Sequence, residues 1–120
     1  MTTPNLILYG IKNCDSVKKA KKWLKDNGHE FQFHDFRVDG LAQHRLNEWL
    51  SQLGWEILLN KRGTSWRTLP DKEKENLDAS KAEALMLENP TLIKRPVLQA
   101  GELLLVGFDS NIYHSQLNQA

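Results

Sequence analysis

The residue best suited to chemistry in this 120-residue chain is Cys14, its only cysteine. It follows the apolar run 5–9 and a short turn, and it precedes a stretch of helical spacing that starts at Asp15. The free backbone N–H groups at a helix start carry about half a positive charge, which favours a thiolate over a thiol. We therefore predict a nucleophilic thiolate at Cys14, stabilised by the backbone of Asp15 and Ser16 and by Lys18 one turn further on.

The alternative for Cys14 is a buried structural cysteine, which is a common role for a free cysteine. The polar neighbours Asn13, Asp15 and Ser16 and the position at a helix start favour the reactive thiolate. A Cys-x-x-Cys redox pair is excluded because Val17 stands where the second cysteine would be. A thiol from another molecule must then resolve any disulfide that forms on Cys14.

Two arginines are predicted to bind an anionic substrate beside Cys14. Arg95 precedes Pro96 at the start of a predicted strand, and an X-Pro bond can be cis there. In the predicted topology this turn lies next to the loop that carries Cys14. Arg62, in the polar turn 60–64, is the second arginine, with a solvated surface role as its alternative. Two guanidinium groups would bind a carboxylate or another oxyanion bidentately.

The elements that position these residues begin with a strand, a helix and a second strand. The apolar run Asn5–Tyr9 predicts a buried strand, and the alternation in Phe31–Phe36 predicts another. Between them, a helix from Asp15 ends at Asn27–Gly28. The lysine-rich run Lys18–Lys25 is predicted to be a solvated face of that helix. A helical crossover between two strands favours parallel pairing.

The rest of the chain predicts helices followed by a hairpin and a last helix. We interpret the whole as one α/β domain over residues 1–120, with a βαβ unit and a ββα unit sharing a mixed sheet and a helical insertion at about 40–90. The predicted features are a helix ending at Gly54, a helix start at Leu69–Asp71 with Pro70 at the first helical position, a helix over Ser80–Glu88 ended by Pro90, strands at Pro96–Leu98 and Leu103–Val106 around Gly101–Glu102, and a helix through Leu117 capped by Asp109 or Ser110.

The composition excludes several classes of protein. Sixteen basic and fifteen acidic side chains give a formal charge of +1, so we expect no nonspecific nucleic-acid binding. The first residues, Met1–Pro4, lead into no long apolar run, and no stretch approaches the roughly 20 apolar residues of a membrane span. The four histidines have no metal-ligand spacing among themselves. We therefore expect a cytoplasmic protein that uses no metal and contacts no membrane.

Four segments resemble the ArsC-like (arsenate reductase/Spx) family, and most closely its YffB-like branch. The resemblance runs nearly from end to end and is most specific in the first segment. The segments are Tyr9–Ala20 (YGIKNCDSVKKA), Asn60–Arg67 (NKRGTSWR), Ile93–Val97 (IKRPV) and Val106–Phe108 (VGF).

The resemblance implies a thioredoxin-like fold with a helical insertion, a single redox cysteine near the N-terminus and glutathione as the electron donor. We therefore predict a glutathione-dependent thiol-disulfide reductase in which Cys14 attacks a disulfide or a glutathione mixed disulfide. Glutathione acts as a cosubstrate, and Arg62, Arg95, Asn13 and Pro96 bind it or the substrate. Asn13 also helps to stabilise the thiolate.

Two alternatives follow from the same resemblance. A glutathione-dependent arsenate reductase is the first, but such enzymes have a histidine where Gly10 stands, a glycine where Asp15 stands and a third arginine that residues 106–108 do not supply. A regulator that binds RNA polymerase, like Spx, is the second. Spx-like regulators under redox control usually carry Cys-x-x-Cys, which Val17 interrupts.

Overall fold

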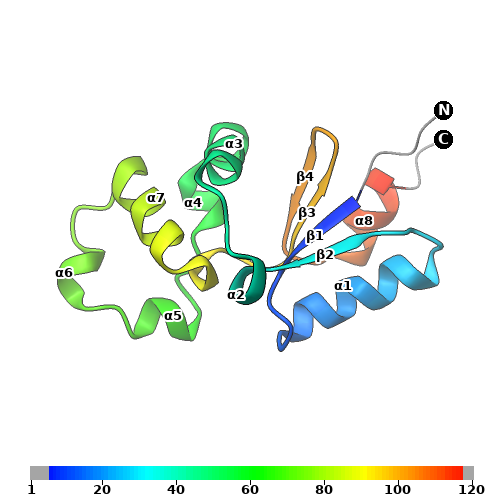
Figure 1. The fold of residues 1–120 in the computed structure, drawn as a ribbon, viewed down its shortest axis with the longest axis horizontal. Helices are drawn as coiled ribbons and strands as arrows, with labels where there is room; N and C mark the ends of the chain where they lie inside the picture. The colour runs from blue at the N-terminus through cyan, green and yellow to red at the C-terminus, as the bar shows by residue number, and fades with distance from the viewer. Residues whose placement is uncertain (1–5, 118–120) are drawn as a thin grey trace. The chain divides into compact units, whose positions relative to one another are not determined.

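The computed structural model describes residues 6–117, which are grouped into two compact units (Figure 1). The first unit contains the chain up to Phe36 and from Arg95 onward, and the second contains Arg37–Lys94. The elements, in order, are β1 (Leu6–Gly10), α1 (Asp15–Asp26), β2 (Gln32–Asp35), α2 (Phe36–Asp39), α3 (Gln43–Leu53), α4 (Trp55–Leu58), α5 (Thr64–Arg67), α6 (Asp71–Lys74), α7 (Ala79–Glu88), the 3₁₀-helix η1 (Pro90–Leu92), β3 (Val97–Ala100), β4 (Leu103–Val106) and α8 (Ser110–Leu117).

The first unit is built on a four-stranded sheet in the order β2-β1-β3-β4. Strands β1 and β2 are parallel, while β3 is antiparallel to both β1 and β4. The chain forms a βαβ unit through α1 and, after the second unit, a ββα unit that ends with α8. This mixed sheet with its helices is the thioredoxin-like α/β fold, which confirms the predicted fold class.

One face of the sheet carries the core of the first unit. Because side chains alternate along a strand, residues two apart on β1 and β3 point to the same face. There they pack with α1 and with Tyr113 of α8, and Cys14 lies against this cluster. The buried members are Leu6, Leu8, Val17, Ala20, Leu24, Leu98, Ala100 and Tyr113.

Helices α1 and α8 begin and end close to where their sequences predict. Asn27 caps the C-terminus of α1, and Gly28 follows with a φ of 76°, a conformation that glycine adopts without a side-chain clash. At the start of α8, Oδ1 of Asp109 accepts the N–H groups of Asn111 at 2.9 Å and Ile112 at 3.3 Å. Asp109 is therefore the cap, and Ser110 is the first helical residue.

The second unit is helical. Helices α3, α4 and α7 pack together around the fully buried side chains of Leu46, Trp49, Leu58 and Met86. Oδ1 of Asp78 caps α7 by accepting the N–H of Lys81 at 2.8 Å. The division into one domain with an insertion at about 40–90 remains a prediction.

Several predicted boundaries differ from the structure by one or two residues: β2 begins at Gln32, α7 at Ala79 and β3 at Val97, and β3 ends at Ala100. Phe36 begins α2 instead of continuing the second strand, and Thr64 begins α5 instead of ending a turn. Pro70 has extended backbone angles (φ −59°, ψ 147°) and is the N-cap of α6, one residue before the predicted position. Helices of four residues are too short to show a helical repeat in the sequence, so their ends were not predictable. Asn5 of the predicted first strand lies outside the described residues.

Across residues 6–117, no helix combines the length and the apolar character that crossing a membrane requires.

Candidate thiol site at the end of the sheet

Cys14 is the N-cap of α1, with φ −133° and ψ 125°. Its backbone carbonyl accepts the N–H of Lys18 at 3.0 Å, which closes the first turn of the helix. The side chain is partly exposed and packs on one side against the core of the first unit, and it makes no capping hydrogen bond. Cys14 is thus a partly exposed residue at the start of a twelve-residue helix.

The residues around Cys14 come from one continuous segment. Asp15 and Ser16 are the first two residues of α1, so their N–H groups are among those that lack a partner inside the helix. Asn13 is exposed in the preceding turn, and Lys18 is exposed on the first turn. A charged thiolate at an N-cap gains from these donors and from the helix dipole. The stabilising role of each residue remains a prediction.

The pairing of β1 with β3 brings Arg95 and Pro96 to the same end of the sheet as Cys14. Tyr9 near the end of β1 lies opposite Val97 at the start of β3. Because these strands are antiparallel, the segment that precedes β3 and the turn that follows β1 lie at one sheet end. The Arg95–Pro96 bond is cis, as the sequence allowed.

The environment of Arg95 and Pro96 is partly buried. The Pro96 carbonyl accepts the N–H of Gly107 at 2.8 Å, which ties the segment before β3 to the residue after β4. Pro96 is buried, and Arg95 is half-buried with its Nε atom inside the protein. The side chain of Arg95 therefore extends from a backbone segment that hydrogen bonds hold in place, beside the turn that carries Cys14.

Arg62 belongs to the second unit. It lies in the turn before α5, where its N–H donates to Oδ1 of Asn60 at 3.0 Å and its side chain is exposed. Asn60 also lies close to Gly63, where an added Cβ would come within 2.9 Å of Asn60 Nδ2. This turn is well defined within its own unit, and a contact between Arg62 and a substrate on Cys14 remains a prediction.

The sequence did not assign Asp35 to this sheet end. Gly10, the last residue of β1, lies opposite Asp35, the last residue of β2. Asp35 thus places a carboxyl group at the end of the sheet that carries the thiol. The predicted parallel pairing of the two strands could have indicated that Asp35 lies near this sheet end. The alternation of apolar and polar side chains does not by itself show which residues of the two strands lie opposite each other.

Within the described part of the chain, no three His, Cys, Asp or Glu side chains gather where they could hold a metal ion.

A mixed sheet of this topology defines a thioredoxin-like protein, and this chain carries its cysteine at the start of the first helix. The sequence pattern of the ArsC family matches residues 9–115. The chain belongs to the ArsC family, as its motifs predicted.

Three similar proteins illustrate this membership. An uncharacterized protein from Haemophilus influenzae is 47% identical over 110 residues, which cover 92% of this chain and 96% of that protein. The solved structure of the YFFB (PA3664) protein is 42% identical, with a TM-score of 0.91 over 94% of this chain and 99% of that one. The global transcriptional regulator Spx of Lactiplantibacillus plantarum is 25% identical, over 88% of this chain and 81% of that protein.

Proposed function

We propose that this protein is a glutathione-dependent thiol-disulfide reductase with Cys14 as its nucleophile. The observation that carries the proposal is the position of Cys14 as the N-cap of α1, at the sheet end that also bears Arg95 and Pro96. Membership of the ArsC family supports oxidoreductase chemistry. The cytoplasm, where thiols are kept reduced, is the compartment in which such an activity would operate.

The reaction has two thiol-exchange steps. The Cys14 thiolate attacks the glutathione sulfur of a mixed disulfide, the substrate thiolate leaves, and Cys14 becomes glutathionylated. A second glutathione thiolate then attacks the adduct, releasing oxidised glutathione and restoring the Cys14 thiolate. The substrate sulfur is reduced to a thiol by two electrons. One glutathione comes from the mixed disulfide and one from solution, and together they leave as oxidised glutathione.

We assign the remaining roles to residues around this sheet end and in the second unit. Arg95 and Arg62 hold the carboxylates of glutathione or of the substrate, because guanidinium groups pair with carboxylates bidentately. Asn13 and Pro96 contact the same molecule, and the first N–H groups of α1 stabilise the thiolate each time it leaves a disulfide.

The test is turnover of a glutathione mixed disulfide of a short cysteine peptide, with oxidised glutathione measured through glutathione reductase. The wild-type protein should turn over only when reduced glutathione is present, and should otherwise stop after one equivalent. Cys14→Ser should show no activity above the uncatalysed exchange. Equal turnover by Cys14→Ser would refute the proposal.

Arsenate reduction is the alternative that the family name favours. We propose that arsenate is a poor substrate, because Gly10 replaces the histidine of glutathione-using arsenate reductases, Asp15 repels an oxyanion and a third arginine is missing. Each lost charged hydrogen bond costs about 1.5–3 kcal/mol, or roughly tenfold to a hundredfold in rate. A kcat/KM for arsenate at or above that for the mixed disulfide would make arsenate reductase the better assignment.

A regulatory role is the second alternative, supported by the similarity to the transcriptional regulator Spx. Under that alternative the partner is RNA polymerase, and the protein catalyses no reaction at Cys14. A pull-down with purified RNA polymerase, compared between wild type and Cys14→Ser, tests it. Stable binding of polymerase together with absent mixed-disulfide turnover would favour the regulator.

A further inference from the structure

Three lysines of α1 lie in line with Cys14 along one side of the helix. Lys18, Lys21 and Lys25 follow Cys14 by four, seven and eleven residues, which places each lysine within about 40° of Cys14 around the helix axis. We call these three residues the lysine row. At about 1.5 Å per residue, the row extends roughly 16 Å from the thiol.

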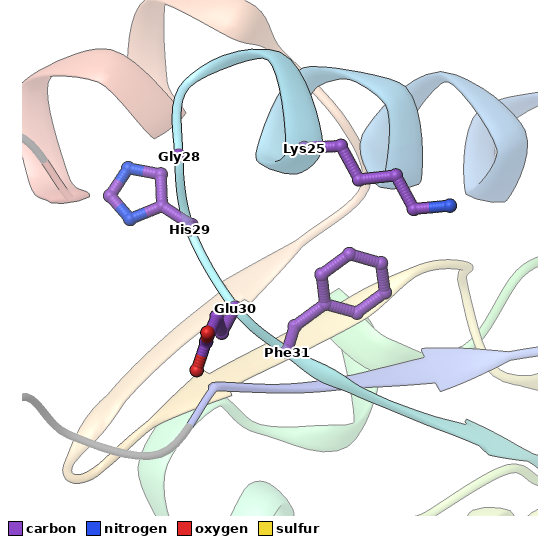
Figure 2. A pocket seen from close by; sticks show the side chains of 5 residues that line it. All are labelled: Lys25, Gly28, His29, Glu30 and Phe31. Carbon is purple, nitrogen blue, oxygen red and sulfur yellow. The ribbon is translucent and has the colours of Figure 1, made fainter.

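The lysine row borders an apolar strip beside β2. Lys21 Nζ lies 3.6 Å from the centre of the Phe33 ring, and Phe31, two residues earlier, packs against the same core. At the far end of α1, Lys25 and Phe31 line a shallow hollow of about 610 Å³. Figure 2 shows both side chains extending to one side of the connecting loop, while His29 points to the other.

The charges on this side of α1 are mainly positive. Burial lowers the pKa of Lys21, and the nearby ammonium groups of Lys25 and Lys12 lower it further, while Asp35 acts in the opposite direction. Glu30 is the acidic residue at the hollow beside Lys25. Ammonium groups close enough to oppose one another's charge form a positive field that an anionic partner would relieve.

We propose that the lysine row and the adjoining Phe31 and Phe33 are a docking surface for an acidic segment of a substrate protein, which presents its disulfide to Cys14. This inference rests on the proposed thiol-disulfide exchange at Cys14. An extended segment of about five residues covers the 16 Å of the row. The acidic side chains therefore lie within about five residues of the substrate cysteine, and an apolar side chain among them contacts the phenylalanine rings.

A protein segment fits this surface better than a nucleic acid does. The reaction at Cys14 requires a sulfur atom in the partner, and a disulfide-bonded cysteine within a peptide supplies it. The formal charge of the whole chain is only +1, which does not favour nonspecific binding of a polyanion.

The experiment compares two cysteine peptides, each joined through a disulfide to thionitrobenzoate. One peptide has Asp and Glu within five residues of the cysteine, and its twin has Asn and Gln at the same positions. One equivalent of protein is added in the absence of glutathione. The rate at which thionitrobenzoate or the peptide is released is then measured. At low ionic strength the acidic peptide should react about tenfold faster, and at about 1 M salt, where the screening length is near 3 Å, the two rates should converge.

Matched variants separate the lysine row from the net charge of the protein. Lys21→Gln/Lys25→Gln should reduce the acidic-to-neutral rate ratio to below about threefold. Lys19→Gln/Lys22→Gln removes the same charge from the same helix, at positions turned about 140° and 80° from Cys14. In the wild type, Lys22 pairs with Asp26 at 2.8 Å and its side chain is 77% exposed. This control variant should keep the wild-type ratio.

The outcomes distinguish the two proposals. If neither peptide reacts with Cys14, the proposed function is wrong. If both react at the same rate in low salt, or if the two double variants behave alike, the docking surface is wrong and the proposed function stands. Stronger inhibition by a DNA oligonucleotide than by polyglutamate of equal charge would assign the row to nucleic acid and also overturn the inference. If Lys21→Gln/Lys25→Gln fails to fold, the acidic-to-neutral rate ratio of the wild type at low and high salt still tests the docking surface.

Discussion

Gly10→Ala tests the packing that holds the turn before Cys14. A Cβ at Gly10 would lie 2.6 Å from Cγ2 and 3.7 Å from Cγ1 of Val17. Carbon atoms in contact are ordinarily about 3.5–4.0 Å apart, so the added methyl group overlaps Val17 by about 1 Å. Val17 is fully buried and β-branched, and in a helix a valine strongly prefers one χ1 rotamer, so a rotation away from Gly10 is costly. The end of β1 or the first turn of α1 must shift instead.

Two effects of opposite sign set the size of the change. Overpacking a core costs about 1–3 kcal/mol, whereas replacing glycine by alanine gains about 0.4–1 kcal/mol by restricting the unfolded chain. The steric cost is larger, so we expect Gly10→Ala to lower the free energy of unfolding by about 1–2 kcal/mol. In a chain of this size, that loss corresponds to a melting temperature lower by roughly 3–10 °C.

Urea unfolding of four proteins provides the assay: the wild type, Gly10→Ala, Val17→Ala and the double variant. Val17→Ala removes Cγ2, the overlapping carbon atom, so the alanine at position 10 should cost at least about 1 kcal/mol less in its presence. Additive effects, within about 0.5 kcal/mol, would refute the steric explanation. Alkylation of Cys14 gives a second readout, because a displaced first turn changes the rate in Gly10→Ala and the double variant restores it.

Three further predictions concern single positions. Val17→Cys should form an internal disulfide with Cys14 on oxidation, because the new thiol displaces glutathione from Cys14. A glutathione adduct of Cys14 that persists in mass spectrometry would contradict this. Arg95→Ala should weaken binding of glutathione or the mixed disulfide by about 1.5–3 kcal/mol in calorimetry, and more than Arg62→Ala does; unchanged affinity would remove Arg95 from the site. Burial raises the pKa of the Tyr113 phenol, whose hydroxyl has no hydrogen-bond partner among residues 6–117, so wild-type stability should fall as pH rises above about 10, where the unfolded chain ionises first. Tyr113→Phe should be about 1 kcal/mol more stable at pH 7 and lack this alkaline decline in urea titrations; a less stable variant would show that the hydroxyl is satisfied.

The first unit was largely predictable because its helices and strands are long enough to show a regular spacing of buried residues in the sequence. The buried positions Val17, Ala20 and Leu24 recur at helical spacing in α1, and the hairpin strands flank Gly101. A helical crossover between two strands left parallel pairing as the favoured arrangement, and β1 and β2 are parallel. From these elements the position of Cys14 at a helix start followed directly.

The surroundings of Cys14 were less predictable because they depend on register and on contacts between distant residues. The pairing of Tyr9 with Val97 fixes where Arg95 lies, and that register is set by the packing of both strand faces. In the second unit, the four-residue helices α4, α5 and α6 show no repeat, so the start of α5 beside Arg62 was misplaced by one residue. Neither the register nor these short helices leave a local pattern in the sequence.

The contact between Gly10 and Val17 joins two features that looked independent in the sequence. Position 10 lacks the histidine of glutathione-using arsenate reductases, and position 17 lacks the second cysteine of a redox pair. The 2.6 Å approach means that any side chain at position 10 meets Cγ2 of Val17, so a histidine there requires a different residue at position 17 or a displaced α1. The packing of Gly10 against Val17 therefore disfavours a histidine at position 10, while valine at position 17 leaves Cys14 without an internal resolving thiol. The second consequence favours a single thiolate that depends on an external thiol, which is the chemistry we propose.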